Sequence, residues 1–303
     1  MLQKPETAAY FRPDKLEDSL ELLARQPMRV VAGATDIYPA QVAQRAWARS
    51  SDQSWLDITN VAALGGITES AGGWRIGALA TWSDLVRADL PACFDGLKAA
   101  AREVGGLQIQ NRATLVGNLC NASPAADGVP PLLCLNATVE LASASGKREL
   151  PLSGFILGNR KIARHTNELV TAVNIPAHQS HSLNSQFFKL GARKYLVISI
   201  VMASGLVSWD EQQQITDCRF AVGACSPVAT RIPSLEKDLI GISLNDLAGN
   251  PKKIAELIGD HHIETLHPID DVRADAAYRR DAARACLTEL LEMHCHHFRG
   301  ASS

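Results

Sequence analysis

The sequence predicts a protein of mixed helices and strands that is divided into two domains. Three observations support this prediction. The chain has 303 residues, enough for two domains or for one large one with an ample core. Glycine-containing turns separate short β-type segments, and helical patterns lie between them. Residues 177–185 are polar and show no periodicity, so we place the domain boundary there.

The first half begins with a helix, a strand, a glycine turn and a second helix. Leu16, Leu20 and Leu23 stand at helical spacing, and acidic residues lie early in that segment. The expected elements are a helix over residues 14–26, a strand over 28–32, a tight turn over 33–36 and a helix over 37–48. A strand that runs into a glycine turn is a place where backbone N–H groups often hold phosphates.

The rest of the first half follows from turn signals. Gly72-Gly73 and Ser145-Gly146 each predict a hairpin turn, and Gly105-Gly106 ends a helix. The expected strands cover residues 56–58, 74–80, 138–142, 147–152 and 168–175, and the expected helices cover 83–88 and 97–104.

The second half changes to long strands followed by helices. Its longest apolar run, Tyr195 to Trp209, is too short and too interrupted by Ser and Gly to cross a membrane, and its β-branched content predicts one buried strand or two short ones. The expected strands cover residues 186–190, 195–209 and 215–224, and the expected helices cover 234–239, 252–258 and about 274–294. The tail that begins near His294 is expected to be frayed rather than a metal-binding tract.

The stretch from Gln108 to Leu141 is unusually dense in Gly, Asn, Ser, Asp and Pro between two apolar runs. Gly permits close approach of the backbone, and the small polar residues hydrogen-bond to local backbone or to a ligand. We therefore interpret the stretch as a loop whose main chain lies against something flat or charged. The alternative is a well-made turn between two buried elements.

Composition and missing motifs exclude several classes. The net charge is −2 and no basic footprint exists, which argues against nucleic acid as a partner. The N-terminus shows no signal-peptide pattern, so a cytoplasmic protein without a membrane partner is expected. The seven Cys include no C-x-x-C pair, so we expect reduced thiols and no metal or cluster framework in this chain. Rossmann, Walker A, Gly-x-Ser-x-Gly and His-Glu-x-x-His motifs are missing, and His261-His262 is interpreted as a solvated pair. Two Gly-rich loops without an acid–base set suit a protein that holds a cofactor with its own chemistry.

Four segments resemble one known family. Val31 to Asp36, VAGATD, resembles an A-G-G-T-D turn, and Gln108 to Asp127, QIQNRATLVGNLCNASPAAD, resembles Q-I-R-N-x-x-T-x-G-G-N-x-x-N-A-S-P-x-x-D. Trp74 to Ala78 contains R-I-G-A, and Asp271 to Arg279 resembles D-x-R…Y-R. The chain is thereby identified as resembling the FAD-binding medium subunits of the molybdenum hydroxylases, which include xanthine dehydrogenase and carbon monoxide dehydrogenase.

The resemblance implies an α+β fold. A PCMH-type FAD-binding domain of two subdomains, at about residues 1–57 and 58–178, would be followed by a smaller C-terminal domain over 183–295. The latter would hold a three-stranded antiparallel sheet with helices, and residues 296–303 would form a tail. Arg273 and Arg279 are expected to be structural ion-pair or interface residues.

The resemblance also implies cofactor-binding residues. Those in the first turn are Arg29, Val30, Val31, Ala32, Gly33, Ala34, Thr35 and Asp36; those in the second are Thr114, Leu115, Val116, Gly117 and Asn118. Those expected elsewhere along the flavin are Val104, Asp127, Val170, Lys189 and Ile198. Each of these five residues also has an interpretation without a cofactor. Val104, Val170 and Ile198 could be core residues, Lys189 could be a surface lysine, and Asp127 could cap a turn.

Three positions depart from the family pattern. Ala34 and Val116 each replace a Gly, and Ala113 stands where many members have Gly. If position 34 needs a positive φ, Ala costs about 1 kcal/mol there. Val116 is expected to crowd the phosphate-facing turn.

The function implied is electron transfer through FAD, with no catalytic or metal-binding residue in this chain. A partner small subunit with [2Fe–2S] clusters would supply electrons, a partner large subunit would hold the molybdenum cofactor, and NAD, a quinone or O₂ would accept the electrons. A heterotrimer or its dimer is expected. The alternatives are a structural or assembly subunit with weakened FAD binding and a self-contained flavin oxidase.

Overall fold

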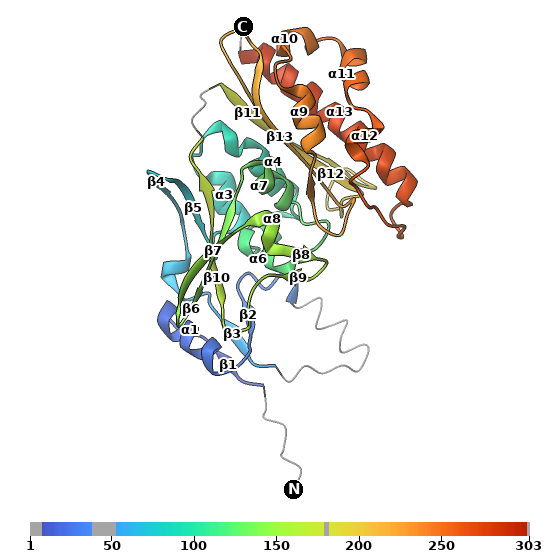
Figure 1. Ribbon diagram of the computed structural model, residues 1–303. Helices are drawn as coiled ribbons and strands as arrows, with labels where there is room; N and C mark the ends of the chain where they lie inside the picture. Colours follow the sequence, from blue (N-terminus) through green and yellow to red (C-terminus); the bar gives the residue numbers. More distant parts are fainter. Residues whose placement is uncertain (1–7, 38–52, 179–181, 302–303) are drawn as a thin grey trace.

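The computed structural model describes residues 8–37, 53–178 and 182–301. The predicted helix over residues 37–48 lies outside the described residues except for Ile37. Figure 1 shows an N-terminal half with two main sheets and a C-terminal half in which a long helix and several short ones cover another sheet. Within the described ranges, no helix combines the length and the apolar character needed to cross a membrane.

The first sheet is small and parallel. Its strands lie in the order β1 (Tyr10–Phe11), β3 (Trp55–Asp57) and β2 (Arg29–Val31). Helix α1 (Leu16–Arg25) connects β1 to β2 and buries Leu20 and Leu23, as their spacing predicted. Parallel strands of one sheet need such a crossover connection. Because of this arrangement, the chain leaves β2 directly into the turn at residues 33–36.

The second sheet is antiparallel and contains both predicted hairpins. Its order is β4 (Ile67–Ser70), β5 (Gly73–Gly77), β10 (Leu169–Pro176), β6 (Thr138–Ser143) and β7 (Gly146–Pro151). The central strand β10 is buried from Leu169 to Val173, which explains its continuous apolar run. A separate two-stranded sheet, formed by β8 (Ile156–Gly158) and β9 (Lys161–Ile162), stands between β7 and β10 in the sequence.

Short helices fill the space between these strands. They are η1 (Ala62–Leu64), α3 (Trp82–Arg87), η2 (Ala92–Phe94), α4 (Asp95–Glu103), α5 (Leu107–Gln110), α6 (Leu115–Asn121), α7 (Val129–Cys134) and α8 (Leu152–Phe155). The prediction of a loop over Gln108–Leu141 was therefore wrong in part, because α5, α6 and α7 lie in it. Thr114 caps α6 by accepting a hydrogen bond from the Gly117 N–H at 3.0 Å, and two prolines begin α7, where a missing N–H costs little. Helices this short show no periodicity in the sequence.

The C-terminal half holds a four-stranded antiparallel sheet rather than a three-stranded one. The predicted strands are β11 (Leu183–Leu190), β12 (Val201–Trp209) and β13 (Ile215–Gly223), and the two-residue β14 (Thr230–Arg231) extends the sheet beyond β13. The helices are α9 (Pro233–Leu239), α10 (Leu244–Leu247), α11 (Pro251–Leu257), α12 (Asp260–Ile263) and α13 (Ala276–Ala301). The mixed α+β fold is confirmed, with one strand more than expected.

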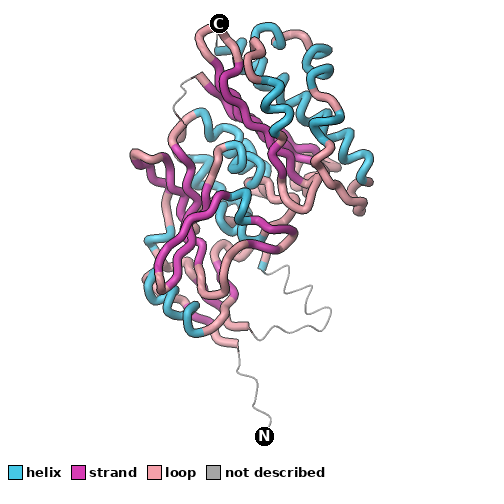
Figure 2. The backbone as a smooth tube through the Cα atoms, in the orientation of Figure 1, coloured by secondary structure: helices cyan, strands magenta, loops and turns pink. Residues whose placement is uncertain are grey.

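This sheet is buried on both faces. Met202 and Leu206 of β12 pack toward the N-terminal half, where α4 and α7 lie. Val201, Ala203 and Val207 point the other way, into a core shared with α13. Figure 2 shows these magenta strands between two groups of cyan helices. Because alternate residues are buried on opposite sides, apolar residues occur on both faces of the strand.

Two predictions about the ends of elements were wrong. Strand β12 begins at Val201, and the exposed residues Tyr195, Leu196 and Ile198 form a loop, since the neighbouring strand β11 ends at Leu190 and offers them no partner. Helix α13 continues to Ala301, past the predicted frayed end, because Cys295 and Phe298 are buried in the second core.

Helix α13 carries a buried histidine, His294, on the side that faces the C-terminal sheet. The ring of His294 is hydrogen-bonded through Nδ1 to the side-chain oxygen of Asn184, and both residues are almost fully buried. Burial, with a smaller contribution from the nearby His297, lowers the pKa of His294 to about 3. The folded protein therefore keeps this ring neutral at pH values where an unfolded chain protonates it.

We expect acid to destabilise the protein through His294. Between about pH 6.5 and pH 3, only the unfolded chain binds this proton, so His294 reduces the free energy of unfolding by about 1.4 kcal/mol per pH unit as the pH falls. Urea unfolding at pH 7.5, 6 and 5 should give a shallower pH dependence for His294→Gln than for the wild type. His296→Gln, on the exposed side of the same helix, is the control and should keep the wild-type dependence. Equal slopes for all three proteins would contradict the assignment.

Candidate functional site

A cleft of about 1000 Å³ opens between the first sheet, the short helices and a loop of the C-terminal half. This volume lies at the upper end of the range for small-molecule sites, about 300–1,000 Å³. Its walls come from the turn after β2, the residues around α6, strands β8 to β10 and the loop at 196–198. The cleft is therefore lined by segments that are far apart in the sequence.

The turn after β2 lies directly against the chain that precedes α6. A Cβ atom on Gly33 would stand 2.0 Å from the carbonyl oxygen of Arg112 and 2.9 Å from the Cα of Ala113. No side chain fits in that space, so glycine is required here by close approach rather than by its backbone angles. The two Gly-containing segments that the sequence singled out are thus in contact.

Backbone N–H groups gather at this contact. Within the described residues, the N–H groups of Gly33, Ala34, Thr35 and Asp36 donate to no protein acceptor. All four residues line the cleft, as do Val116 and Gly117 in the first turn of α6. Unpaired N–H groups in successive residues form a binding site for anions such as phosphate.

Three arginines contribute positive charge to the cleft wall. Arg29 lies over the ring of Trp55 at 5.1 Å, Arg164 donates to the carbonyl oxygen of Glu168 at 2.6 Å, and Arg160 contacts Asn121. These contacts hold the guanidinium groups in place at the edge of the cleft. Arginine pairs well with phosphate because its planar donors match two oxygens at once.

A buried ion pair connects the cleft to the C-terminal half. Asp127 accepts hydrogen bonds from Lys189 Nζ at 2.8 Å and from Ser199 Oγ at 3.0 Å. Burial raises the pKa of Asp127, and the charge of Lys189 opposes that rise. The Lys189 side chain is only 5% exposed and also donates to the Glu103 carbonyl oxygen at 3.3 Å, so its interpretation as a surface lysine was wrong.

Most of the predicted cofactor-binding residues line the cleft. These are Arg29, Val30, Ala32, Gly33, Ala34, Thr35, Asp36, Val104, Thr114, Val116, Gly117, Asn118, Asp127, Val170 and Ile198. Val31, Leu115 and Lys189 do not line it, because the first two side chains point into the core and Lys189 lies against Asp127. Ile198 is exposed, so core packing does not explain its position.

Sequence reasoning missed several residues of the cleft. Arg160 and Arg164 stand in and after a short hairpin that no pattern predicted, and Cys120 stands on α6. Ser199, which donates a hydrogen bond to Asp127 of the cleft, stands inside the apolar run for which the sequence predicts a strand. No local signal distinguishes these residues from surface or core positions.

The departures from the family pattern have different consequences. Ala34 has a φ of +63°, so the expected strain of a side chain in the left-handed region is present. Val116 instead occupies the first turn of α6 without a left-handed φ, and its side chain is buried. The side chain of Val116 packs into the core around α6, although the residue also lines the cleft, so the crowding of the phosphate-facing turn stays a prediction.

Two family models together match almost the whole chain. The first, described as the FAD binding domain in molybdopterin dehydrogenase, matches residues 5–178. The second, described as the CO dehydrogenase flavoprotein C-terminal domain, matches residues 186–293.

The chain belongs to the FAD-binding medium subunits of the molybdenum hydroxylase family.

Individual members of this family agree with that assignment. The xanthine dehydrogenase FAD-binding subunit of Escherichia coli O157:H7 is 30% identical over 279 residues, which cover 90% of both chains. The glyceraldehyde dehydrogenase medium chain of Sulfolobus acidocaldarius is 28% identical over 282 residues, covering 92% of this chain and 95% of the relative. These molybdenum hydroxylase relatives are subunits of dehydrogenases, so the family is one of oxidoreductases.

A solved structure shares the fold. Carbon monoxide dehydrogenase from Hydrogenophaga pseudoflava, in a form that lacks the Mo-pyranopterin moiety of its cofactor, contains a chain that superimposes with a TM-score of 0.84. The match covers 96% of this chain and 98% of that one at 22% sequence identity. The resemblance of this FAD-binding subunit to the family, first seen in short motifs, therefore extends to the whole fold.

Replacing Ala34 with Gly should stabilise this FAD-binding subunit. Glycine adopts φ values near +63° without the clash that the alanine Cβ causes, and we expect a gain of about 1 kcal/mol in the free energy of unfolding. Urea unfolding of both proteins measures the difference. Ala125→Gly is the matched control, because Ala125 also lines the cleft but has no positive φ, and it should give no gain. Equal stabilities for Ala34→Gly and the wild type would show that the turn carries no strain.

Removing Lys189 should leave a buried charge without its partner. We expect Lys189→Met to reduce the free energy of unfolding by about 3–5 kcal/mol at pH 8. The loss should be smaller at pH 5, because an unpaired buried Asp127 carboxylate is relieved by taking up a proton. Lys161→Met, at an exposed position, should change stability by less than about 0.5 kcal/mol. The same loss at both pH values would contradict the role given to Asp127.

Proposed function

We propose that this chain binds FAD in the cleft and serves as the electron-transfer subunit of a molybdenum hydroxylase complex. The observation that carries the proposal is the contact between the Gly33 turn and the chain before α6, where successive backbone N–H groups have no acceptor among the described residues. A neutral or purely apolar ligand would leave those groups unpaired at a cost, whereas a pyrophosphate satisfies them.

The residues divide into two groups along the cleft. Gly33 to Asp36 and Thr114 to Asn118 would hold the pyrophosphate, with the arginines at 29, 160 and 164 supplying positive charge. Val104, Val170 and Ile198 would supply apolar walls for the isoalloxazine ring. Asp127 would accept a hydrogen bond from the cofactor, and Lys189 and Ser199 would keep its carboxylate ionised and oriented.

A bound flavin takes up electrons singly or in pairs, which suits a junction between a one-electron cluster and a two-electron acceptor. This chain supplies binding, orientation and control of access to the ring. Its exposed loop at 195–198 lies at the cleft, so it limits what reaches the flavin. The external acceptor in this proposal is NAD, a quinone or O₂.

Partner subunits complete the proposal. Six of the seven cysteines are buried, Cys120 is partly exposed, and the sequence contains no C-x-x-C pair, a pattern that does not suit an iron–sulfur cluster in this chain. A small subunit would therefore carry the [2Fe–2S] clusters and a large subunit the molybdenum cofactor, in a heterotrimer or its dimer. The names of relatives support this, since they include medium chains and a subunit of a dehydrogenase complex. Free thiols suit the reducing cytoplasm, where we place the complex.

A second function has one specific observation in its favour. The strained Ala34 stands in the very turn that would hold the pyrophosphate, so a structural or assembly subunit with weakened FAD binding is the alternative. The absorption spectrum of the purified chain distinguishes the two. Flavin bands near one equivalent support electron transfer, and a colourless protein that takes up no added FAD overturns it.

Gly117→Val should abolish FAD retention. A Cβ at Gly117 would stand 2.7 Å from Thr114 Oγ1, the atom that caps α6, so the added side chain displaces the cap and fills the turn. We expect flavin content to fall by more than about tenfold while circular dichroism shows the helices and sheets retained. Gly154→Ala, where an added Cβ meets no neighbour, is the control and should keep full flavin content. Retention of FAD by a folded Gly117→Val protein would show that the first turn of α6 does not hold the cofactor.

A further inference from the structure

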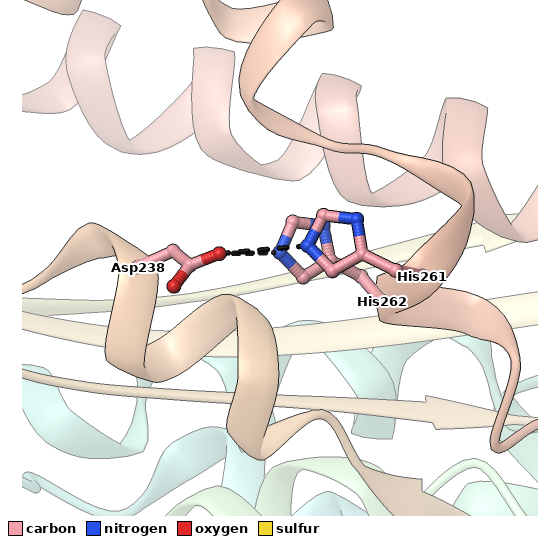
Figure 3. A group of neighbouring side chains, drawn as sticks. All are labelled: Asp238, His261 and His262. Atoms are coloured by element: carbon pink, nitrogen blue, oxygen red, sulfur yellow. Dashed lines mark hydrogen bonds and ion pairs between the residues drawn. The ribbon is translucent and has the colours of Figure 1, made fainter.

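Three side chains converge on the outer helical layer of the C-terminal half, away from the cleft. Asp238 comes from α9, and His261 and His262 are neighbours on α12 (Figure 3). The sequence suggested that the two histidines are a solvated pair. That interpretation was wrong for His262, whose side chain is 0% exposed.

The three ligand-type atoms face one another. His262 Nε2 lies 3.1 Å from Asp238 Oδ2, and His261 Nε2 lies 3.5 Å from the same oxygen. The two rings are tilted against each other with centroids 3.8 Å apart, and one donor atom from each residue lies within 4.8 Å of the others. In Figure 3 both rings turn a nitrogen toward the carboxylate.

These separations also suit a metal ion. With metal–ligand bonds of about 2.0–2.1 Å, neighbouring ligand atoms of a tetrahedral site are about 3.3 Å apart. The distances of 3.1 Å and 3.5 Å lie on either side of this value. Both histidines pair with the same carboxylate oxygen, so one oxygen and two ring nitrogens converge on one point. Two imidazoles and one carboxylate are ligands for zinc and its neighbours in the first transition row.

The site combines a buried ligand with open access. The Gly259 N–H donates to Nδ1 of His262 at 3.1 Å, and Nε2 of the same ring lies toward Asp238. Leu235, Leu239 and Ile263 bury one face of α9 and α12 in the second core, so both helices are held in place. Asp238 and His261 are 49% and 60% exposed, which leaves room for water ligands and an entry path.

We propose that Asp238, His261 and His262 form a binding site for a divalent transition-metal ion of the zinc type, which would cross-link α9 to α12. The metal replaces the hydrogen that His262 shares with Asp238. While Nδ1 of the neutral His262 ring accepts the hydrogen bond from the Gly259 N–H, the proton of the ring is on Nε2. A metal ion that binds at Nε2 requires the other tautomer, in which the proton is on Nδ1. The Gly259 hydrogen bond is then broken. The Gly259 amide therefore reports directly on occupancy of this site.

The test uses the full chain loaded with FAD and titrated with zinc chloride at pH 8. Isothermal titration calorimetry should give one equivalent for the wild type, with a rise in Tm on binding. His261→Gln and Asp238→Asn should each weaken binding by more than about tenfold. Both residues are exposed, so these variants should fold.

The matched control is His296→Gln with His297→Gln, because these two residues are also adjacent histidines and both are exposed. The control protein should bind zinc as the wild type does. Unchanged zinc affinity in His261→Gln and Asp238→Asn, or an absence of stoichiometric binding, would overturn the proposal and leave a hydrogen-bonded Asp238–His262 pair only.

A second measurement keeps the proposal testable if a variant is unstable. In protein labelled with ¹⁵N-glycine, the Gly259 amide resonance should shift in proportion to the zinc added, up to one equivalent. Binding of zinc without a change at Gly259 would identify adventitious binding elsewhere and would also overturn the proposal.

Discussion

The structure of the cleft depends on one contact between two main chains. The turn after β2 approaches the carbonyl group of Arg112 so closely that a Cβ on Gly33 would lie 2.0 Å from its oxygen. Only glycine allows this approach, and residues of the turn and of the first turn of α6 consequently line the same cavity. The strain at Ala34 persists because the strand before it and the contact beside it determine the path of the turn. A constraint on backbone space thus creates the features that suit a pyrophosphate.

The C-terminal half completes this cleft through a buried ion pair. Asp127 belongs to the N-terminal half, whereas Lys189 lies in β11 and Ser199 precedes β12 in the C-terminal half. Because Ser199 is fixed at Asp127, the loop before it is held at the cleft. The chain therefore joins cofactor binding to the packing of its two halves, and a change in the ion pair affects both stability and the cleft wall.

The C-terminal sheet lies between the cleft and the proposed metal site. One of its faces packs on α4 and α7 beside the cleft, and the other carries the helical layer that includes α9, α12 and α13. The Asp238 and histidine group lies in that outer layer, so a metal bound there would act on the helices without contacting the flavin. The side chain of His294 on α13 is buried against the sheet, where its neutrality at ordinary pH is a condition for close packing.

The sequence by itself determined the mixed fold, the hairpins, helix α1 and the two Gly-containing turns, because glycine turns and apolar spacing are local properties of the chain. It also determined the family, through motifs whose backbone contacts need particular residues in order. The tertiary structure alone decided that residues 195–198 leave the strand, that Arg160 and Arg164 reach the cleft, and that Lys189, His262 and His294 are buried. Each of these depends on neighbours far along the chain, and the burial and partners of a polar side chain are set by those neighbours rather than by its own segment.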